Sequence, residues 1–271
     1  MWHHLTQERL IGWCRQAVRF VLPVECLACE QSLTVDPVPF FCTACWQEIR
    51  PLQQPTCTIC DQPFVSHAAT SHTPNHQCHH CQERPPAFQR AWTLFPYVST
   101  LKDAICAFKY RGTYTLAAPL GRLMISALPA DIAVDMIVPV PLHPTRLRER
   151  EFNQSLLLAD QLGRHLACPV SATSLSRIAK TDPQTTLPRQ ARLQNLRKAF
   201  AVRRPQDLTG KRILLVDDVF TTGTTLHECA KTLQRAGSGP IFALTLARTI
   251  DTNLIPDRIL AEQATQSFGA H

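Results

Sequence analysis

Four pairs of cysteines, each with two residues between its members, constrain the fold of this 271-residue chain more than any other feature. At the cysteine content of this chain, chance would give about half of one such pair, so four within one segment form a strong signal. In a CxxC turn both thiolates can face one ion at about 2.3 Å, and two turns complete a tetrahedral Zn²⁺ site that has no open position for catalysis. The predicted zinc ligands are Cys26, Cys29, Cys42, Cys45, Cys57, Cys60, Cys78 and Cys81.

The spacing leaves the pairing of the four CxxC turns open. We expect the first pair to combine with the second and the third with the fourth, while an interleaved arrangement stays an alternative. Several histidines near the last two pairs could replace a thiolate, but four cysteines already suffice for each site, so positions in solvent or beside the ligands are favoured. These histidines are His67, His72, His76, His79 and His80.

The first 22 residues argue against secretion and therefore against a disulfide framework. Arg9, Arg15 and Arg19 interrupt the apolar positions, so the segment does not match a signal peptide. No stretch approaches the roughly 18 apolar residues of a membrane-spanning helix. We therefore expect a cytoplasmic protein with reduced thiols, and an amphipathic helix over residues 1–22 that packs on its own domain rather than on a membrane.

The composition divides the chain into a small module and a larger domain. The module covers residues 23–90 and ends near Pro85 and Pro86, which disfavour helix. Residues 91–250 alternate strand-like apolar runs with helical periodicity, and residues 251–271 form a C-terminal tail. Strands separated by helices imply parallel pairing, so the predicted fold is an α/β doubly wound sheet. Strands are expected at 91–98, 136–140, 212–216 and 241–247, and helices near 101–108, 116–124, 153–165 and 225–235.

Charge is distributed unevenly between these parts. Residues 23–90 hold three Lys/Arg and six Asp/Glu, net −3, whereas residues 142–212 hold fourteen Lys/Arg and five Asp/Glu, net +9. An anionic partner is therefore expected on the larger domain. Aromatic side chains in the cysteine module could stack on bases, but a role in its small core is favoured. They are Phe40, Phe41, Trp46 and Phe64.

The stretch RILLVDDVFTTGTTLHECA carries the most specific chemical signal of the larger domain. A buried strand, residues 213–216, ends in Asp217 and Asp218, and a Thr/Gly-rich loop follows and opens a helix. Unpaired backbone N–H groups at a helix N-terminus suit a phosphate, and Gly223 lets the backbone approach it closely. The two carboxylates would repel a phosphate, so we expect them to face the hydroxyl groups of a ribose or a Mg²⁺ ion. The alternative is that the acids only cap the loop.

This stretch resembles a known signature. VDDVFTTGTT is similar to the phosphoribosyl-pyrophosphate (PRPP) signature of type I phosphoribosyltransferases, and further segments resemble the ComF/GntX family of competence-associated proteins over about residues 24–250. One departure is Glu151, where that family usually has Gly. The matching segments, beside the CxxC module, are FKYRG (108–112), VPVPLH (138–143), RLREREFNQS (146–155), KTDPQT (180–185), RQARLQN (189–195) and KAF (198–200).

The resemblance implies roles for particular residues. Asp217 and Asp218 would hold the ribose hydroxyls as the catalytic pair, and the loop after the first core strand would cradle pyrophosphate. Arginines that alternate along residues 146–150, Arg148 among them, offer forked donors for phosphate oxygens, although a solvated basic loop is equally expected. The implied 5′-phosphate ligands are Thr221, Thr222, Gly223, Thr224 and Thr225, the pyrophosphate loop is Val140, Pro141 and Leu142, and a mobile loop would contribute Lys180, Gln184, Arg189, Arg192 and Asn195.

Two functions compete at this point. The resemblance implies a protein that handles incoming single-stranded DNA in natural transformation, with PRPP or a ribose 5-phosphate-type ligand in its pocket. The alternative is an active Mg²⁺-dependent phosphoribosyltransferase that acts on an unidentified nitrogen acceptor. An interaction scaffold that docks a DNA-uptake helicase or channel is a third interpretation.

Overall fold

The computed structural model describes residues 24–33, 36–53, 55–64, 76–110, 112–130, 132–178 and 199–250. The predicted N-terminal helix, the C-terminal tail and the five residues of the predicted mobile loop, Lys180, Gln184, Arg189, Arg192 and Asn195, lie outside these ranges. The chain divides into two compact units, Met1–Ile49 and Arg50–His271. The first CxxC site belongs to the first unit, and the second CxxC site and the larger domain belong to the second.

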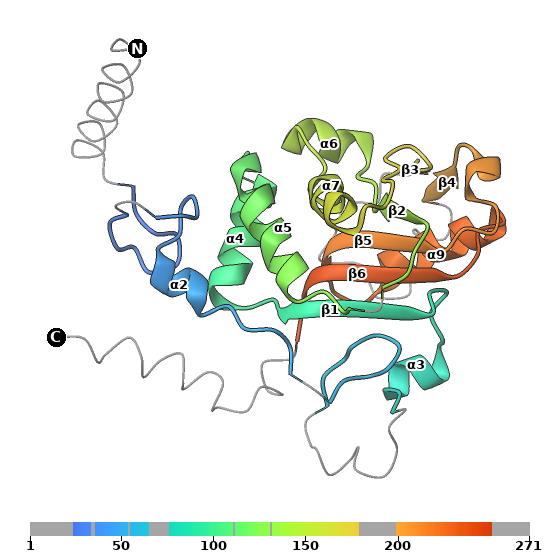
Figure 1. Ribbon diagram of the computed structural model, residues 1–271, viewed down its shortest axis with the longest axis horizontal. Coiled ribbons are helices and arrows are strands. Elements are labelled where there is room, and N and C mark those ends of the chain that lie inside the picture. The colour runs from blue at the N-terminus through green and yellow to red at the C-terminus, as the bar shows by residue number, and fades with distance from the viewer. Residues whose placement is uncertain are drawn as a thin grey trace. The chain divides into compact units, whose positions relative to one another are not determined.

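A four-stranded parallel sheet forms the centre of the second unit (Figure 1). Its strands are β1 (Arg90–Pro96), β2 (Met136–Pro139), β5 (Ile213–Phe220) and β6 (Ile241–Arg248), in the order β1-β6-β5-β2. Each pair of neighbouring strands is parallel. The predicted doubly wound parallel sheet is thus confirmed.

Strand β5 is longer than its sequence predicts. The expected end was Val216, but the strand continues through both aspartates to Phe220, and Asp217 lies opposite Thr245 of β6 in the ladder. β2 pairs only with residues 213–216, whereas β6 pairs with β5 over its whole length, so the ladder with β6 holds the backbone of residues 217–220. Ladder pairing therefore overrides the weak strand propensity of Asp.

Helices cover both faces of the sheet. Ile213 and Leu215 of β5 share a buried cluster with Leu226 and Leu233 of α9 (Thr224–Arg235). Because side chains alternate along a strand, the equally buried Leu214 and Val216 face the other side, where α7 (Gln154–Leu166) packs against β2 and β5. A strand buried on both faces explains why Ile213–Val216, ILLV, is a continuous apolar run.

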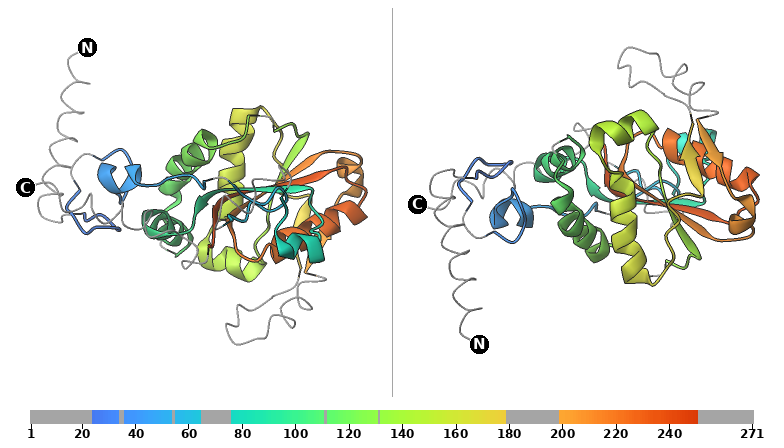
Figure 2. Two further views of the ribbon diagram at one scale, coloured as in Figure 1. Left: turned by 90° about the horizontal axis from the view of Figure 1, so that it is seen from below. Right: turned by 90° about the horizontal axis from the view of Figure 1, so that it is seen from above.

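Two further helices follow β1. They are α4 (Ser99–Tyr110) and α5 (Ala117–Ser126), which are joined through the 3-10 turn η2 (Tyr114–Leu116), and α5 packs against α7. Figure 2, which views the molecule along two other directions, shows α4 and α5 (green) toward one end of the sheet and α9 (orange) toward the other. Among the described residues, no helix is long and apolar enough to cross a bilayer.

Several regular elements were not predicted from the sequence. Residues 144–150, expected as a basic loop, form the helix α6 (Pro144–Arg150), whose first residue is a proline with φ already suited to a helix start. Strands β3 (Leu175–Arg177) and β4 (Phe200–Val202) pair antiparallel as a separate two-stranded sheet. A 3-10 turn, η3 (Pro205–Leu208), then leads toward β5. Short helices α2 (Thr43–Gln47) and α3 (His79–Glu83) complete the described elements.

Candidate functional site

The loop between β5 and α9 has the geometry of an anion cradle. Gly223 is the N-cap of α9 and adopts a left-handed conformation, with φ of 73°, and as a glycine it has no side chain to cap the first turn. A Cβ atom at this position would lie 2.6 Å from Cζ of Phe220, so both the backbone angle and the space require glycine. The N–H of Thr224 donates to Oγ1 of Thr222 at 3.5 Å. The next two N–H groups of α9, those of Thr225 and Leu226, have no acceptor in the preceding loop, which the structure describes in full, and are available to an external acceptor.

Threonine hydroxyls line the same loop. Oγ1 of Thr222 lies 2.8 Å from Oγ1 of Thr224, within hydrogen-bond distance, and Thr221 and Thr222 are both exposed. These hydroxyls can rotate to donate to an anion. The predicted set of residues 221–225 is thus gathered in one turn, directly after the carboxylate pair of β5.

Each carboxylate of that pair has its own partners. Asp217 accepts hydrogen bonds of 2.9 Å from Oγ of Ser155 and from the backbone N–H of Asp218. Burial raises the pKa of the Asp217 carboxyl to about 7, and the neighbouring Asp218 carboxylate adds to that shift. Asp218 forms an ion pair with Lys109, whose Nζ lies 3.0 Å from Oδ2 of Asp218. Two adjacent acids are therefore held in different environments.

The end of β2 lies at the same edge of the sheet as this pair. The backbone N–H of Val140 donates to the carbonyl of Val216, which places residues 140–142 beside the beginning of the Asp217–Asp218 segment. Nδ2 of Asn153 in turn donates to the carbonyl of Val140, at 3.1 Å, and its Oδ1 caps the N-terminus of α7. Carboxyl ends of parallel strands are where doubly wound sheets bind their ligands.

Residues 146–150 form part of the helix α6, so the three arginines that alternate in the sequence, Arg146, Arg148 and Arg150, do not all point in one direction. Arg150 is engaged on the protein itself, since Nη1 donates to Oε1 of Gln154 at 3.1 Å and the guanidinium lies 5.0 Å from the centre of the Tyr110 ring. Arg148 is exposed, and residues two apart on a helix point in different directions. The three arginines thus do not form one row of donors, although Arg148 remains open to solvent.

Glu151 adopts the conformation that explains the glycine usual at this position. It ends α6 in the left-handed region, with φ of 68°, and its N–H donates to the carbonyl of Leu147 at 2.8 Å. Such a C-terminal position favours glycine, which has no Cβ to clash. The exposed side chain of Glu151 therefore occupies a backbone site that costs energy for any residue other than glycine.

Sequence reasoning missed two residues of the site, Lys109 and Ser155. Both lie inside segments that carried the family resemblance, FKYRG and RLREREFNQS, so the signal was present without a role attached. Their partners are far away in the sequence: 62 residues separate Ser155 from Asp217. Only packing of α4 and α7 against the sheet brings these side chains to the carboxylates.

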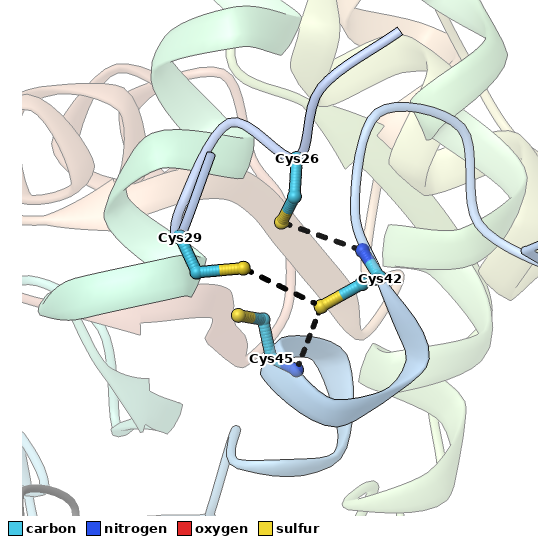
Figure 3. A group of neighbouring side chains, drawn as sticks. All are labelled: Cys26, Cys29, Cys42 and Cys45. Carbon is cyan, nitrogen blue, oxygen red and sulfur yellow. Dashed lines mark hydrogen bonds between the residues drawn. The ribbon is translucent and has the colours of Figure 1, made fainter. Parts of the chain in front are cut away.

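The first CxxC site is a closed group of four thiols (Figure 3). The Sγ atoms of Cys26, Cys29, Cys42 and Cys45 all lie within 4.8 Å of one another. Backbone N–H groups point at two of the sulfurs, from Cys42 to Cys26 and from Cys45 to Cys42, each at 3.4 Å. Such contacts favour thiolates, and four thiolates suit a structural Zn²⁺ ion.

The second CxxC site repeats this arrangement with Cys57, Cys60, Cys78 and Cys81, whose Sγ atoms also lie within 4.8 Å of one another. Sequential pairing is therefore confirmed. Of the histidines that could have replaced a thiolate, His76, His79 and His80 stand outside both groups, and His67 and His72 lie outside the described residues. Phe41 is fully buried, as expected of a core residue rather than a stacking platform.

The two sites share one backbone pattern. In each, the residue after the second cysteine of the first pair is left-handed: φ is 62° for Glu30 and 57° for Asp61. Its N–H donates to the carbonyl of the first cysteine, at 2.9 Å in both sites. The chain therefore contains two copies of one zinc-binding turn, and the copies differ in what surrounds them.

The second copy is built into the sheet. Asp61 accepts a 2.9 Å hydrogen bond from the backbone N–H of Thr93 in β1, and the N–H of Ala91 donates to the carbonyl of Ile59. Cys57, Cys60 and Cys81 belong to the same buried cluster as the strands. In the sequence the module of residues 23–90 looks like one piece, but its second half belongs to the compact unit of the larger domain because Asp61 completes the edge of β1.

Comparisons with known proteins agree with this architecture. Residues 153–257 match the phosphoribosyl transferase domain and residues 17–82 match the double zinc ribbon domain. The fold and its two kinds of site thus define a phosphoribosyltransferase-like protein with a zinc ribbon that is held by structural zinc.

Similarity to named proteins assigns the chain to one family within this class. The chain is 32% identical over 235 residues to the DNA utilization protein YhgH of Escherichia coli strain K12, which covers 84% of this chain and 99% of the relative. It is 29% identical to competence protein F of Haemophilus influenzae, over 82% of this chain and 96% of that one. It is 24% identical to competence protein ComFC of Bacillus subtilis strain 168, over 83% and 95%. The chain belongs to this family of DNA utilization and competence proteins, as its motifs predicted.

Proposed function

We propose that this protein binds PRPP or another ribose 5-phosphate-type ligand at the loop of residues 221–225 and handles incoming single-stranded DNA in natural transformation. The observation that carries the proposal is the geometry of Gly223, whose left-handed backbone opens the first turn of α9 beside two carboxylates. The amide groups of that turn suit the 5′-phosphate. Asp217 and Asp218 offer acceptors for the two ribose hydroxyls.

The carboxylates also suit Mg²⁺, which prefers oxygen ligands and is commonly bound through one or two carboxylates together with the phosphates of its substrate. Asp217 and Asp218 would hold it, and the ion would neutralise charge on a pyrophosphate group. The residues of this chain supply the rest: the loop binds the phosphate, Ser155 orients Asp217, and Lys109 balances the charge of Asp218.

Calorimetric titration with PRPP and Mg²⁺ tests the pocket. Asp218→Ala should weaken binding by about 1.5 to 3 kcal/mol, the range expected for hydrogen bonds to a charged group. Asp207→Ala is the matched control, because Asp207 is an exposed acid of η3 outside the site and its removal should leave the affinity unchanged. Equal affinities of wild type and Asp218→Ala would contradict the proposed ribose contact.

The DNA part of the proposal is supported by the names of the relatives and by charge. Residues 142–212 carry a net charge of +9, and a strand of phosphates that displaces counterions there would bind in a salt-dependent way. The site of action would be cytoplasmic, at the inner side of the membrane, next to a DNA-uptake helicase or channel. A ribose-phosphate pocket could receive a nucleotide or the end of a strand.

Salt titration of single-stranded DNA binding tests this part. We expect the affinity to fall steeply between about 50 and 200 mM salt, as it does for proteins that contact several phosphates. Arg148→Ala on the exposed side of α6 should reduce the slope, whereas Arg122→Ala, at an exposed position of α5 outside residues 142–212, serves as the control. Binding that is absent at low salt would count against DNA handling.

A second candidate function is an active Mg²⁺-dependent phosphoribosyltransferase with an unidentified nitrogen acceptor. Lys109 and the carboxylate pair favour it, since the carboxylates could stabilise the positive charge that develops at C1 and the lysine cation could stabilise the negative charge on the departing pyrophosphate. Release of pyrophosphate from PRPP, measured against a panel of bases and amines, distinguishes turnover from binding. Release that depends on one acceptor would establish the enzyme, and its absence throughout the panel would favour a binding protein.

A further inference from the structure

Arg248 connects the second zinc site to the sheet. It ends β6 and is 5% exposed. Its Nη1 donates to the carbonyl of Cys60, a predicted zinc ligand, at 2.6 Å, and Nε and Nη2 both donate to Oε1 of Gln62. All three nitrogens of the guanidinium therefore bind the zinc-binding turn, and a rigid fork of this kind fixes the turn in one orientation.

The other face of the same guanidinium lies against the ring of Phe220. Its central carbon is 4.4 Å from the ring centre, a cation–π distance. Phe220 is the last residue of β5 and is 4% exposed, and Phe88 packs edge-on against it at 6.4 Å. The ring is thus held between the zinc-binding turn and the body of the domain.

Phe220 in turn supports the loop of residues 221–225, the proposed phosphate loop. Its ring lies directly under Gly223, where a Cβ atom would be 2.6 Å from Cζ. The position of the ring consequently sets how far the backbone of Gly223 can move toward the sheet. A continuous series of contacts runs from Cys60 through Arg248 and Phe220 to the N-cap of α9.

We propose that Arg248 is a positioning residue through which zinc at the second site holds the phosphate loop in its binding conformation. This inference rests on the proposed function of that loop. The second site suits the ion, because four thiols lie within 4.8 Å of one another and three of them are buried. The first zinc site, in the other compact unit, offers an internal comparison that should lack the effect.

The first experiment compares zinc-site variants by their affinity for ribose 5-phosphate, measured by calorimetry. Cys60→Ser should weaken binding on the order of 10-fold, while Cys29→Ser at the first site should leave it unchanged. Arg248→Lys should weaken binding similarly with two zinc ions still bound, since an ammonium cannot bind both acceptors and stack as a plane. Gln62→Met, which removes only the acceptor of Nε and Nη2, gives a milder variant.

The second experiment measures the reverse effect and needs no change at the second site. If zinc there favours phosphate binding, ribose 5-phosphate must favour zinc retention by the same factor. In a Cys29→Ser/Cys45→Ser chain, which keeps only the second site, saturating ribose 5-phosphate should raise the fraction of zinc that the protein retains at equilibrium against a colorimetric chelator. Adding Arg248→Lys to that chain should abolish the protection. A purely structural arginine would give no such ligand dependence.

The outcomes separate this inference from the function on which it rests. Wild-type protein that does not bind ribose 5-phosphate overturns both. Wild-type binding with equal affinities in Cys60→Ser, Arg248→Lys and Cys29→Ser overturns only the role of Arg248. Zinc retention that does not depend on ribose 5-phosphate, in the chain with Arg248 intact, also overturns the role of Arg248. This result does not rely on the affinity variants, so it holds even where a variant has lost affinity because it folds poorly.

Discussion

Nζ of Lys109 lies 3.0 Å from Oδ2 of Asp218, and both side chains are largely withdrawn from solvent, at 16% and 11% exposure. The pair joins the last turn of α4 to the strand that precedes the phosphate loop. A cation in this position lets two adjacent acids exist beside the proposed phosphate site, because it offsets the repulsion that each would exert on a bound anion. The site is therefore electrostatically balanced before any ligand enters.

Replacing Lys109 by Met should destabilise the protein by about 1 to 3 kcal/mol, since it leaves the mostly buried Asp218 without its cation. Urea unfolding followed by circular dichroism measures this loss. Lys102→Met is the matched control, because Lys102 is exposed on the same helix and its loss should change stability by less than about 0.5 kcal/mol. Equal effects of the two substitutions would show that the ion pair of Lys109 contributes no more to stability than an exposed lysine does.

Stability should depend on the protonation of Asp217. Its pKa is raised from the ordinary value of 3.8 to about 7, so the folded state holds a proton that the unfolded state releases. This contribution is fully present below about pH 4 and is lost as the pH rises through about 7. Unfolding free energies of wild type should therefore fall between about pH 4 and about pH 7 relative to Asp217→Asn, which keeps the acceptor for Ser155 but cannot ionise. A constant difference across that range contradicts the raised pKa.

Gly223→Ala should impair binding of ribose 5-phosphate as well as stability. The added Cβ meets Phe220 at 2.6 Å and the backbone angle is left-handed, so the loop must move. Gly237→Ala shares the positive φ, at +88°, but meets nothing within 4 Å, and should cost only about 1 kcal/mol of stability. Calorimetry on both variants separates the two effects, and weakened binding in Gly237→Ala would argue against a local cause.

Glu151→Gly and Glu149→Gly, two residues apart, should change the stability of the protein in opposite directions. Glu151→Gly relieves a left-handed conformation at the end of α6 and should stabilise the protein by about 1 kcal/mol. Glu149→Gly lies within the same helix, where glycine is unfavourable, and should destabilise it by about 0.5 to 1 kcal/mol. Thermal melts of the two variants compared with wild type provide the test. A shift in the same direction for both would mean that the conformation of Glu151 carries no strain.

Metal analysis should find close to two zinc ions per chain. Each group of four thiols completes a tetrahedron by itself, so the double substitution Cys29→Ser/Cys45→Ser should remove one ion and leave the other. Mass spectrometry under native conditions would show both stoichiometries directly. Finding one ion in the wild type would mean that one group is not a zinc site.

The sequence by itself predicted the features that depend on local spacing. CxxC turns, the strand that leads to Asp217 and Asp218, and the Thr/Gly loop each lie within a short segment, whose chemistry is set by neighbouring residues. The end of β5 was placed too early and α6 was missed, because pairing with β6 and the start at Pro144 decide these boundaries rather than residue preference.

Contacts between distant segments were decided only by the tertiary structure. Ser155 and Asp217 are 62 residues apart, and Arg248 reaches the carbonyl of Cys60 over 188 residues. In the sequence Asp61 lies within the cysteine module, yet its carboxylate accepts a hydrogen bond from the backbone N–H of Thr93 in β1. The sequence determined which chemical groups this protein has, and packing of helices and the second zinc turn on one sheet decided which of them meet, because burial in a common core holds side chains together regardless of their separation along the chain.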